Sequence, residues 1–260
     1  MGVSLIGVVF DFDDTLVPDS TTKLLQSYRI DAKKFWEDAK RLVLEGYDPA
    51  QAFLKLFLDN VGVGKPLGEI TNQNLYEFGA TLNPDFFPGI PGLFDDLRTE
   101  VSKYRDIQIE FYIISGGLQP IIEGTRLVRD KYVNSVYACR LAGDSPDEVL
   151  RYVQRCVTFT EKTRYLFEIN KGLSPEHTLR KPHLVNKAVP LRERRIPFRN
   201  MMYIGDGLTD IPCFSLVRKG ARGAKGGIAF GVFDRERKDP KTAFREIGRA
   251  SCRERVSYHV

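Results

Sequence analysis

The feature that most constrains the fold is an apolar run that ends in a cluster of acids. Residues 5–10 (LIGVVF) are almost entirely apolar, which is typical of a strand buried on both faces of a parallel sheet. Asp11, Asp13 and Asp14 follow at once, and their like charges repel one another at the end of that strand. A cation or a chemical reaction would make this concentration of negative charge favourable. We therefore expect a functional site there.

Strands and helices alternate through most of the later sequence, which predicts βαβ units and a parallel sheet. We expect strands at 109–114, 133–139, 201–204 and 228–230, and helices at 93–104, 119–131 and 163–170. The predicted fold class is therefore α/β, with a Rossmann-like parallel sheet. Residues 21–82 carry no strand signal and show apolar residues at helical spacing, with Asp48 and Pro49 opening one helix. This predicts a helical insertion after the first strand.

Two later strands also end in polar motifs. The strand at 109–114 leads to Ser115-Gly116-Gly117, and the strand at 201–204 leads to GDGLTD at 205–210. Sites in such sheets lie beyond the carboxyl ends of the strands, so we expect these motifs to converge. Clustered Asp oxygens suit Mg²⁺, and Ser115 with backbone N–H groups at the start of a helix suits an anion. Lys162, near the start of another helix, can bring positive charge to that anion, as phosphoryl transfer requires.

Other signals are better explained by structure than by function. Lys171 competes with Lys162, but it falls in the last turn of its helix, where a cation favours the helix dipole. The basic stretch at 180–199 has little aromatic interleaving and predicts a solvated loop, not a nucleic-acid site. The glycines at 220–227 do not form a dinucleotide-binding motif, and the three histidines show no zinc-ligand spacing.

The motifs DFDDT, ISGG, Lys162 and GDGLTD, in this order, resemble the four motifs of the haloacid dehalogenase-like (HAD) superfamily. The resemblance runs from Val3 to about Phe230, and the chain is most similar to the phosphoserine phosphatase-like branch. The helical insertion lies where this superfamily carries a type 1 cap. The resemblance implies a catalytic core at residues 1–17 and 86–246 and a helical cap at 18–85. We expect the cap to act as a lid over the site.

The resemblance also implies a role for each motif residue. Asp11 is expected to be the nucleophile that forms an aspartyl-phosphate, and Asp13 the acid that protonates the leaving oxygen and later deprotonates water. The residues expected at the phosphate are Thr15, Ser115, Gly116 and Lys162. The residues expected at Mg²⁺ are Asp11, Asp13 (through its carbonyl), Asp206 and Asp210. Chemistry supports the first two roles independently, because one carboxylate can attack phosphorus while a second, two residues on, reaches the leaving group.

We therefore expect a Mg²⁺-dependent phosphatase that acts on a small phosphorylated metabolite through an aspartyl-phosphate. Two alternatives stay open: a phosphomutase or other phosphotransferase, and a catalytically silent binding module. A dehalogenase is disfavoured, because it would need the nucleophile but not the other acids. The phosphoserine phosphatase-like branch carries a Glu nine residues after the nucleophile. In this chain that position is Ser20, and the nearest acid is Asp19, one place earlier. In the fourth motif, Thr209 stands where the branch has an Asn. Both differences argue against phosphoserine itself as the expected substrate. The sequence names neither the substrate nor the oligomeric state.

Bulk properties predict a cytoplasmic protein. No apolar run approaches the roughly 20 residues of a membrane span, and the first residues resemble a strand, not a signal peptide. Four cysteines without CxxC spacing are expected to be reduced thiols, and the net charge of +5 is compatible with an anionic substrate. Residues 247–256 (IGRASCRERV) resemble the translation of a DNA-sequencing adapter. We therefore expect 247–260 to be a non-native tail.

Overall fold

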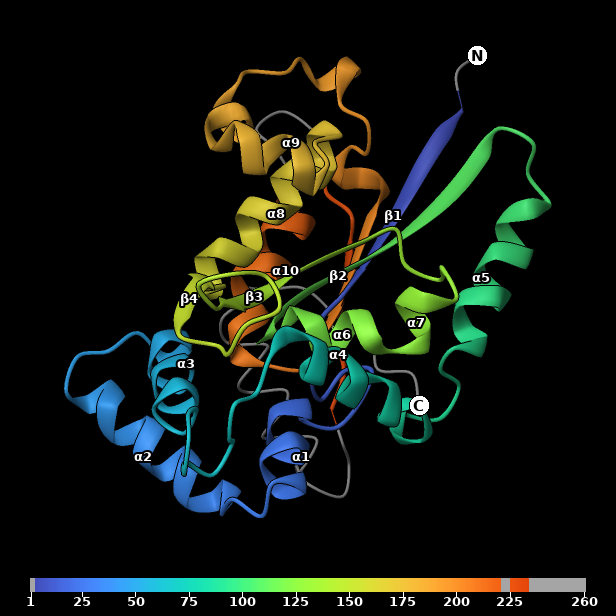
Figure 1. Cartoon of the computed structure of the whole chain (residues 1–260). Helices are drawn as coiled ribbons and strands as arrows, with labels where there is room; N and C mark the ends of the chain where they lie inside the picture. Colours follow the sequence, from blue (N-terminus) through green and yellow to red (C-terminus); the bar gives the residue numbers. More distant parts are fainter. Residues whose placement is uncertain (1–2, 221–224, 234–260) are drawn as a thin grey trace.

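The structure, a computed structural model, describes residues 3–220 and 225–233 (Figure 1). Its centre is a six-stranded sheet in the order β4-β3-β2-β1-β5-β6. The strands are β1 (Ser4–Phe10), β2 (Ile107–Leu118), β3 (Ser135–Ala142), β4 (Tyr152–Arg155), β5 (Met201–Gly205) and β6 (Ile228–Gly231). Every pairing is parallel except β3 with β4, which is antiparallel. The predicted α/β class is confirmed, and the predicted tail at 247–260 lies outside the described residues.

Strand β1 is buried in the middle of the sheet, as its apolar run predicts. Val8, Val9 and Phe10 are at most 2% exposed, and β1 pairs with β2 on one side and β5 on the other. Phe10 is in register with both Ile113 and Ile204, so the polar motifs that follow the three strands start at nearly the same level. This register brings three segments that are far apart in sequence to one edge of the sheet.

Helices cover both faces of the sheet (Figure 1). The core helices are α5 (Gly92–Ser102), α6 (Gln119–Gly124), α7 (Arg126–Arg129), α8 (Phe159–Lys171), α9 (Pro175–Arg180) and α10 (Ile211–Lys219). Short 3₁₀ turns lie at Asn83–Asp85, Pro182–Asn186, Leu191–Glu193, Phe198–Asn200 and Leu208–Asp210. Figure 1 shows α5 and α7 on one side of the sheet and α8 and α10 on the other. Two apolar clusters of buried residues fill the two interfaces.

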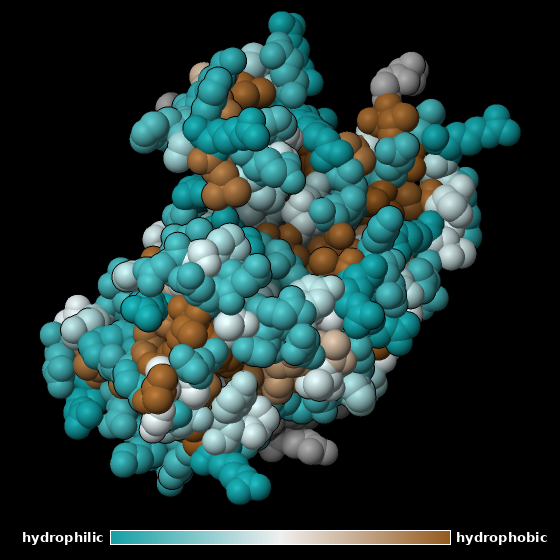
Figure 2. Space-filling model, in the orientation of Figure 1, coloured by the Kyte–Doolittle hydropathy of each residue, from teal (hydrophilic) through white to brown (hydrophobic). Residues whose placement is uncertain are grey.

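The predicted helical insertion between β1 and β2 is present and contains α1 (Ser20–Ser27), α2 (Ala32–Leu44), α3 (Pro49–Asp59) and α4 (Asn72–Thr81). Asp48 caps α3 by accepting a hydrogen bond from the Ala50 N–H at 2.9 Å, and Pro49 is the first helical residue, as predicted. Figure 2 shows a mostly hydrophilic surface with several groups of hydrophobic residues, one of which lies over the insertion. None of the helices in the described ranges is both long and apolar enough to cross a membrane.

Helix α4 packs directly against the core helix α6 through two glycines. A Cβ atom at Gly79 would lie 2.0 Å from the carbonyl oxygen of Ile121, and one at Gly124 would lie 1.9 Å from that of Tyr76. Only hydrogen at these positions permits such an approach of two backbones. The last helix of the insertion is therefore fixed to the core by backbone contact.

Two expectations about element bounds are wrong, and one strand was not predicted. Strand β2, expected to end at residue 114, continues through Ser115-Gly116-Gly117 to Leu118, where it pairs again with Cys139 of β3. The next helix begins at Gln119, as expected, so Ser115 lies before this helix and not at its start. The single helix expected at 119–131 is two helices that break at Thr125, whose ψ is 156°. The antiparallel edge strand β4 was not predicted. Cys139, Cys156 and Cys213 are free thiols, in agreement with the expectation for these three.

Candidate active site

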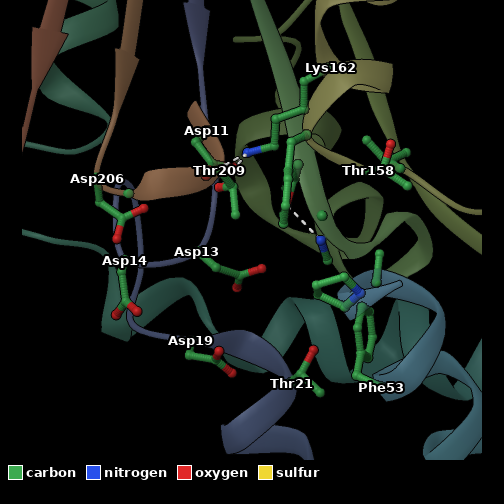
Figure 3. Close-up of a pocket in the computed structure, with 18 of the residues that line it drawn as sticks. Asp11, Asp13, Asp14, Asp19, Thr21, Phe53, Thr158, Lys162, Asp206 and Thr209 are labelled. Atoms are coloured by element: carbon green, nitrogen blue, oxygen red, sulfur yellow. Dashed lines mark hydrogen bonds and ion pairs between the residues drawn. The ribbon is translucent and has the colours of Figure 1, made fainter. Parts of the chain in front are cut away.

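A cavity of about 320 Å³ lies beyond the carboxyl ends of β1, β2 and β5, with the helical insertion on its other side (Figure 3). The three motifs and Lys162 all reach it, as the sequence predicts. The motif residues that line it are Asp11, Asp13, Asp14, Ser115, Gly116, Gly117, Lys162, Asp206, Gly207 and Thr209. Active sites of parallel α/β sheets lie at this edge.

The centre of the site is an ion-pair network around Lys162. Its Nζ lies 2.9 Å from Oδ2 of Asp11 and 2.8 Å from Oδ1 of Asp210. The Lys162 side chain is 2% exposed, although it reaches the cavity from α8. The competing Lys171 donates instead to the carbonyl oxygens of Val185 and Lys187, outside the cavity. The structure thus places Lys162 at the cavity and Lys171 away from it.

Burial and charge shift the pKa values within this network in predictable directions. Burial lowers the pKa of Lys162, but Asp11 and Asp210 outweigh it and raise that pKa above its ordinary value, so the ammonium stays charged. Burial, with the charge of Asp210, raises the pKa of Asp11 well above its ordinary value, although Lys162 opposes this. One ammonium thus does not balance the carboxylates that surround it.

Asp210 stabilises the ion-pair network from a buried position. It is fully buried and does not line the cavity itself, but its carboxylate lies beside those of Asp11 and Asp206, where it was expected. Its Oδ1 accepts a hydrogen bond from the Tyr203 hydroxyl at 2.6 Å, and its Oδ2 accepts one from the Gly207 N–H at 3.3 Å. A Cβ at Gly205 would lie 2.4 Å from Asp210 Oδ2, which explains the first glycine of the GDG motif. Asp210 is therefore held where it orients Lys162.

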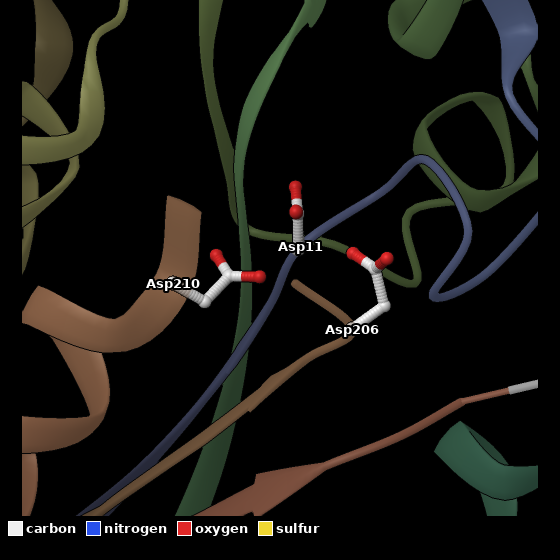
Figure 4. A group of neighbouring side chains, drawn as sticks. All are labelled: Asp11, Asp206 and Asp210. Carbon is white, nitrogen blue, oxygen red and sulfur yellow. The ribbon is translucent and has the colours of Figure 1, made fainter. Parts of the chain in front are cut away.

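Three acids can hold a cation. Asp11, Asp206 and Asp210 each offer a carboxylate oxygen, and these oxygens lie within 4.8 Å of one another (Figure 4). Carboxylate oxygens are the donors that Mg²⁺ prefers, and the excess of carboxylates over ammonium groups makes a bound cation electrostatically favourable. The donor set thus fits a magnesium ion. The carboxylate of Asp13 is not in this group, and the expected contribution of its carbonyl oxygen stays a prediction.

Asp13 stands apart from the metal group and faces the insertion. Its Oδ1 accepts a hydrogen bond from the Ser20 N–H at 2.7 Å, and its side chain is half-buried. Burial and the nearby charge of Asp19 raise the pKa of Asp13 to about 7. A Cβ at Gly117 would lie 2.4 Å from Asp13 Oδ2, so the SGG motif leaves room for this carboxyl group. An acid with this pKa can both give and accept a proton near neutral pH.

The residues expected at the phosphate are only partly brought together. Ser115 and Gly116 line the cavity, and Ser115 Oγ accepts a hydrogen bond from the Gly117 N–H at 2.9 Å. Thr15 is not part of the lining. Its hydroxyl is buried and has no hydrogen-bond partner within the described part of the chain. The structure therefore places Ser115, Gly116 and Lys162 at the cavity, and Thr15 outside its lining.

Sequence reasoning expected the insertion over the site, but it named none of the residues on the side of the cavity that faces Lys162 and the metal group. Val157, Thr158 and Phe159 line it just before Lys162, because α8 begins at Phe159 and not near Thr163. The signal was present, since Thr158 caps the helix by accepting from the Glu161 N–H, which is the S/T-x-x-E pattern. The insertion contributes Asp19, Thr21, Trp36, Pro49, Ala50 and Phe53.

Comparison of structures identifies the class of fold. The chain superposes on a HAD family hydrolase from Salmonella enterica serovar Typhi with a TM-score of 0.54 and 15% identity, over 82% of this chain and 60% of that one. It superposes on a substrate-bound phosphoserine phosphatase with a TM-score of 0.51 and 15% identity, over 88% and 86% of the two chains. The chain thus spans about three fifths of the length of the Salmonella protein. It has the HAD hydrolase fold, as its motifs suggest.

Sequence comparison identifies a relative of the chain. It is 32% identical over 238 residues to an uncharacterized protein of Borreliella burgdorferi, and the match covers 82% of this chain and 79% of that protein. The chain belongs to the same family as this protein. No family model matches the chain.

Proposed function

We propose that this protein is a Mg²⁺-dependent phosphatase that hydrolyses a small phosphomonoester through an aspartyl-phosphate at Asp11. One observation carries the proposal. Lys162 and the acids of the first and fourth motifs meet in one cavity, at the edge of the sheet where α/β enzymes bind their ligands. The similarity to HAD hydrolases and phosphoserine phosphatases supports the same reaction class.

The first step transfers the phosphoryl group to the protein. Asp11 attacks phosphorus, the bond from phosphorus to the leaving oxygen breaks, and Asp13 gives that oxygen its proton. Ser115, Gly116 and Lys162 hold the other phosphoryl oxygens. Asp11 and Asp206, with Asp210 beside them, would hold Mg²⁺, which would offset the charge of the phosphate when bound.

The second step releases phosphate and restores the protein. Asp13, now ionised, removes a proton from a water molecule that attacks the phosphorus of the aspartyl-phosphate. The bond between phosphorus and Asp11 breaks, inorganic phosphate leaves, and Asp13 is protonated again for the next substrate. The position of Asp13, beside the insertion and apart from the metal group, supports its assignment to the proton transfers.

The proposal also divides the chain into a catalytic core at residues 1–17 and 86–246 and a cap at 18–85 that closes over the cavity. The cavity supports this division, because the insertion lines one side of it and the motifs line the other. Closure would exclude bulk water while the phosphoryl group is transferred.

The test is the Mg²⁺-dependent release of phosphate from 4-nitrophenyl phosphate by the full chain, with Asp11→Asn as the critical variant. The variant should lose activity by several orders of magnitude, as expected when a nucleophile is removed. Circular dichroism of both proteins controls for folding. Loss of a nucleophile typically lowers kcat by several orders of magnitude, so a variant that kept more than about a few per cent of kcat would exclude Asp11 as the nucleophile. Transfer of phosphate to an alcohol instead of water would identify a phosphotransferase, and binding without turnover a silent module.

A further inference from the structure

The two sides of the cavity differ sharply in chemistry. The core side carries the acids and Lys162. The other side, formed by the insertion and the start of α8, is largely apolar and consists mainly of Trp36, Pro49, Ala50, Phe53, Val157 and Phe159. A phosphate bound at Lys162 would leave the rest of its ester pointing toward this apolar side (Figure 3).

The aromatic part of this wall is held in place by its own contacts. The Trp36 Nε1–H donates to Thr22 Oγ1 at 2.8 Å, so the one polar atom of the indole is already used within the protein. The Trp36 ring lies edge-on to Phe35 at 5.3 Å between centroids and contacts Phe53 at 6.0 Å. Trp36 and Phe53 therefore offer the ligand a preorganised hydrocarbon surface.

The charges at the cavity disfavour an anionic group on the alcohol part of the substrate. Among the described lining residues Lys162 is the only lysine, arginine or histidine, and it already pairs with Asp11 and Asp210. Asp13, at the boundary between the two sides, is an acid, and so is Asp19, where the insertion begins. A second anion on the substrate would lose its hydration there and meet carboxylates instead of a cation.

We propose that the substrate is the phosphomonoester of an alcohol with an aromatic or otherwise apolar body and no anionic group, and that Trp36, Phe53 and Phe159 determine this specificity. This inference rests on the proposed phosphatase function. Phosphoserine is disfavoured, because its alcohol part carries a carboxylate. The cavity of about 320 Å³ is near the lower limit for small-molecule sites and suits a phosphate with a single ring.

Three esters of primary alcohols test the proposal: benzyl phosphate, O-phosphoserine and 2-phosphoglycolate. Because each releases a primary alcohol, differences in kcat/KM report mainly on recognition and not on leaving-group reactivity. We expect kcat/KM for benzyl phosphate to exceed the other two by at least about ten-fold, the effect of 1.4 kcal/mol in transition-state binding. Equal or better hydrolysis of either anionic ester would overturn the specificity. Failure of every ester, 4-nitrophenyl phosphate included, would instead overturn the phosphatase function itself.

A charge-introducing variant tests the wall directly. Phe159 lines the cavity and is 39% exposed, so Phe159→Arg creates no buried void. The new cation should move the kcat/KM ratio by about ten-fold toward 2-phosphoglycolate and away from benzyl phosphate. The matched control is Tyr47→Arg, an equally exposed aromatic (40%) of the insertion that is not part of the lining, and its ratio should not change. An unchanged ratio in Phe159→Arg would show that this wall does not contact the alcohol.

Discussion

The ion pairs of Lys162 allow a quantitative test of the site without any substrate. Lys162→Met keeps the length of the side chain and removes its charge. The ammonium lies 2.9 Å from Asp11 and 2.8 Å from Asp210, and all three side chains are at most 8% exposed. Removing one partner of a buried ion pair typically costs about 3–5 kcal/mol, because the other charge stays buried and uncompensated.

The structure favours the lower end of that range for Lys162→Met. Asp210 keeps its hydrogen bond from the Tyr203 hydroxyl, and Asp11 keeps one from the Phe12 N–H at 2.8 Å. We therefore expect the free energy of unfolding to fall by about 3 kcal/mol in the presence of a chelator. Urea denaturation followed by circular dichroism measures this change.

Lys171→Met is the matched control, since it makes the same substitution in the same helix. Lys171 donates to two carbonyl oxygens and forms no ion pair with an acidic side chain of the described residues, so its loss should cost only about 1 kcal/mol. If the free energy of unfolding of Lys162→Met lay within about 1 kcal/mol of that of the parent, the buried ion pairs would not stabilise the fold as described.

Three further predictions concern the metal, the proton donor and the fold. Asp206→Asn should raise the Mg²⁺ concentration needed for half-maximal phosphate release by at least about ten-fold, and an unchanged requirement would remove Asp206 from the metal group. Since the pKa of Asp13 is raised to about 7, the acid form dominates below that pH, and the single-turnover rate of phosphorylation should fall as pH rises through about 7. Gly124→Ala should destabilise the protein by about 1–3 kcal/mol or more, because its Cβ would meet the Tyr76 carbonyl at 1.9 Å. Gly92→Ala, where a Cβ meets nothing within 4 Å, is the control, and equal thermal unfolding of the two variants would contradict the packing described.

The convergence of the site could be predicted from sequence because two simple signals agree. The apolar run before Asp11 identifies a central strand, and polar residues after parallel strands must meet at one edge. Local capping signals were equally informative, as at Asp48 and Pro49, which open α3 as expected. These features depend on neighbours in sequence or on the common direction of the strands.

Features that depend on tertiary pairing could not be predicted. Ser115-Gly116-Gly117 has the composition of a turn, yet it is strand, because Leu118 regains a partner in β3 after a shift of register. Helix α1 has a Ser- and Thr-rich start and only eight residues, so its helical signal is weak and its buried residues stabilise it. Trp36 and Phe53 show the same apolar spacing as core residues. Only the structure separates the atoms that face the cavity from those that face the core.

The contact between α4 and α6 also limits which part of the proposed cap can move. The segment that returns from the insertion is tied to the core, since the Arg126 N–H donates to Asn83 Oδ1 at 2.9 Å and the Phe87 N–H donates to the Leu16 carbonyl at 3.0 Å. A movement of this segment away from the core would break these hydrogen bonds and separate the closely packed backbones of α4 and α6, so such a movement is disfavoured. The segment between α3 and α4, by contrast, contains three glycines with positive φ, at residues 62, 64 and 68. Closure of the cap is therefore easiest as a movement of α1 to α3 relative to a stationary α4, and this movement would carry Trp36 and Phe53 toward the phosphate.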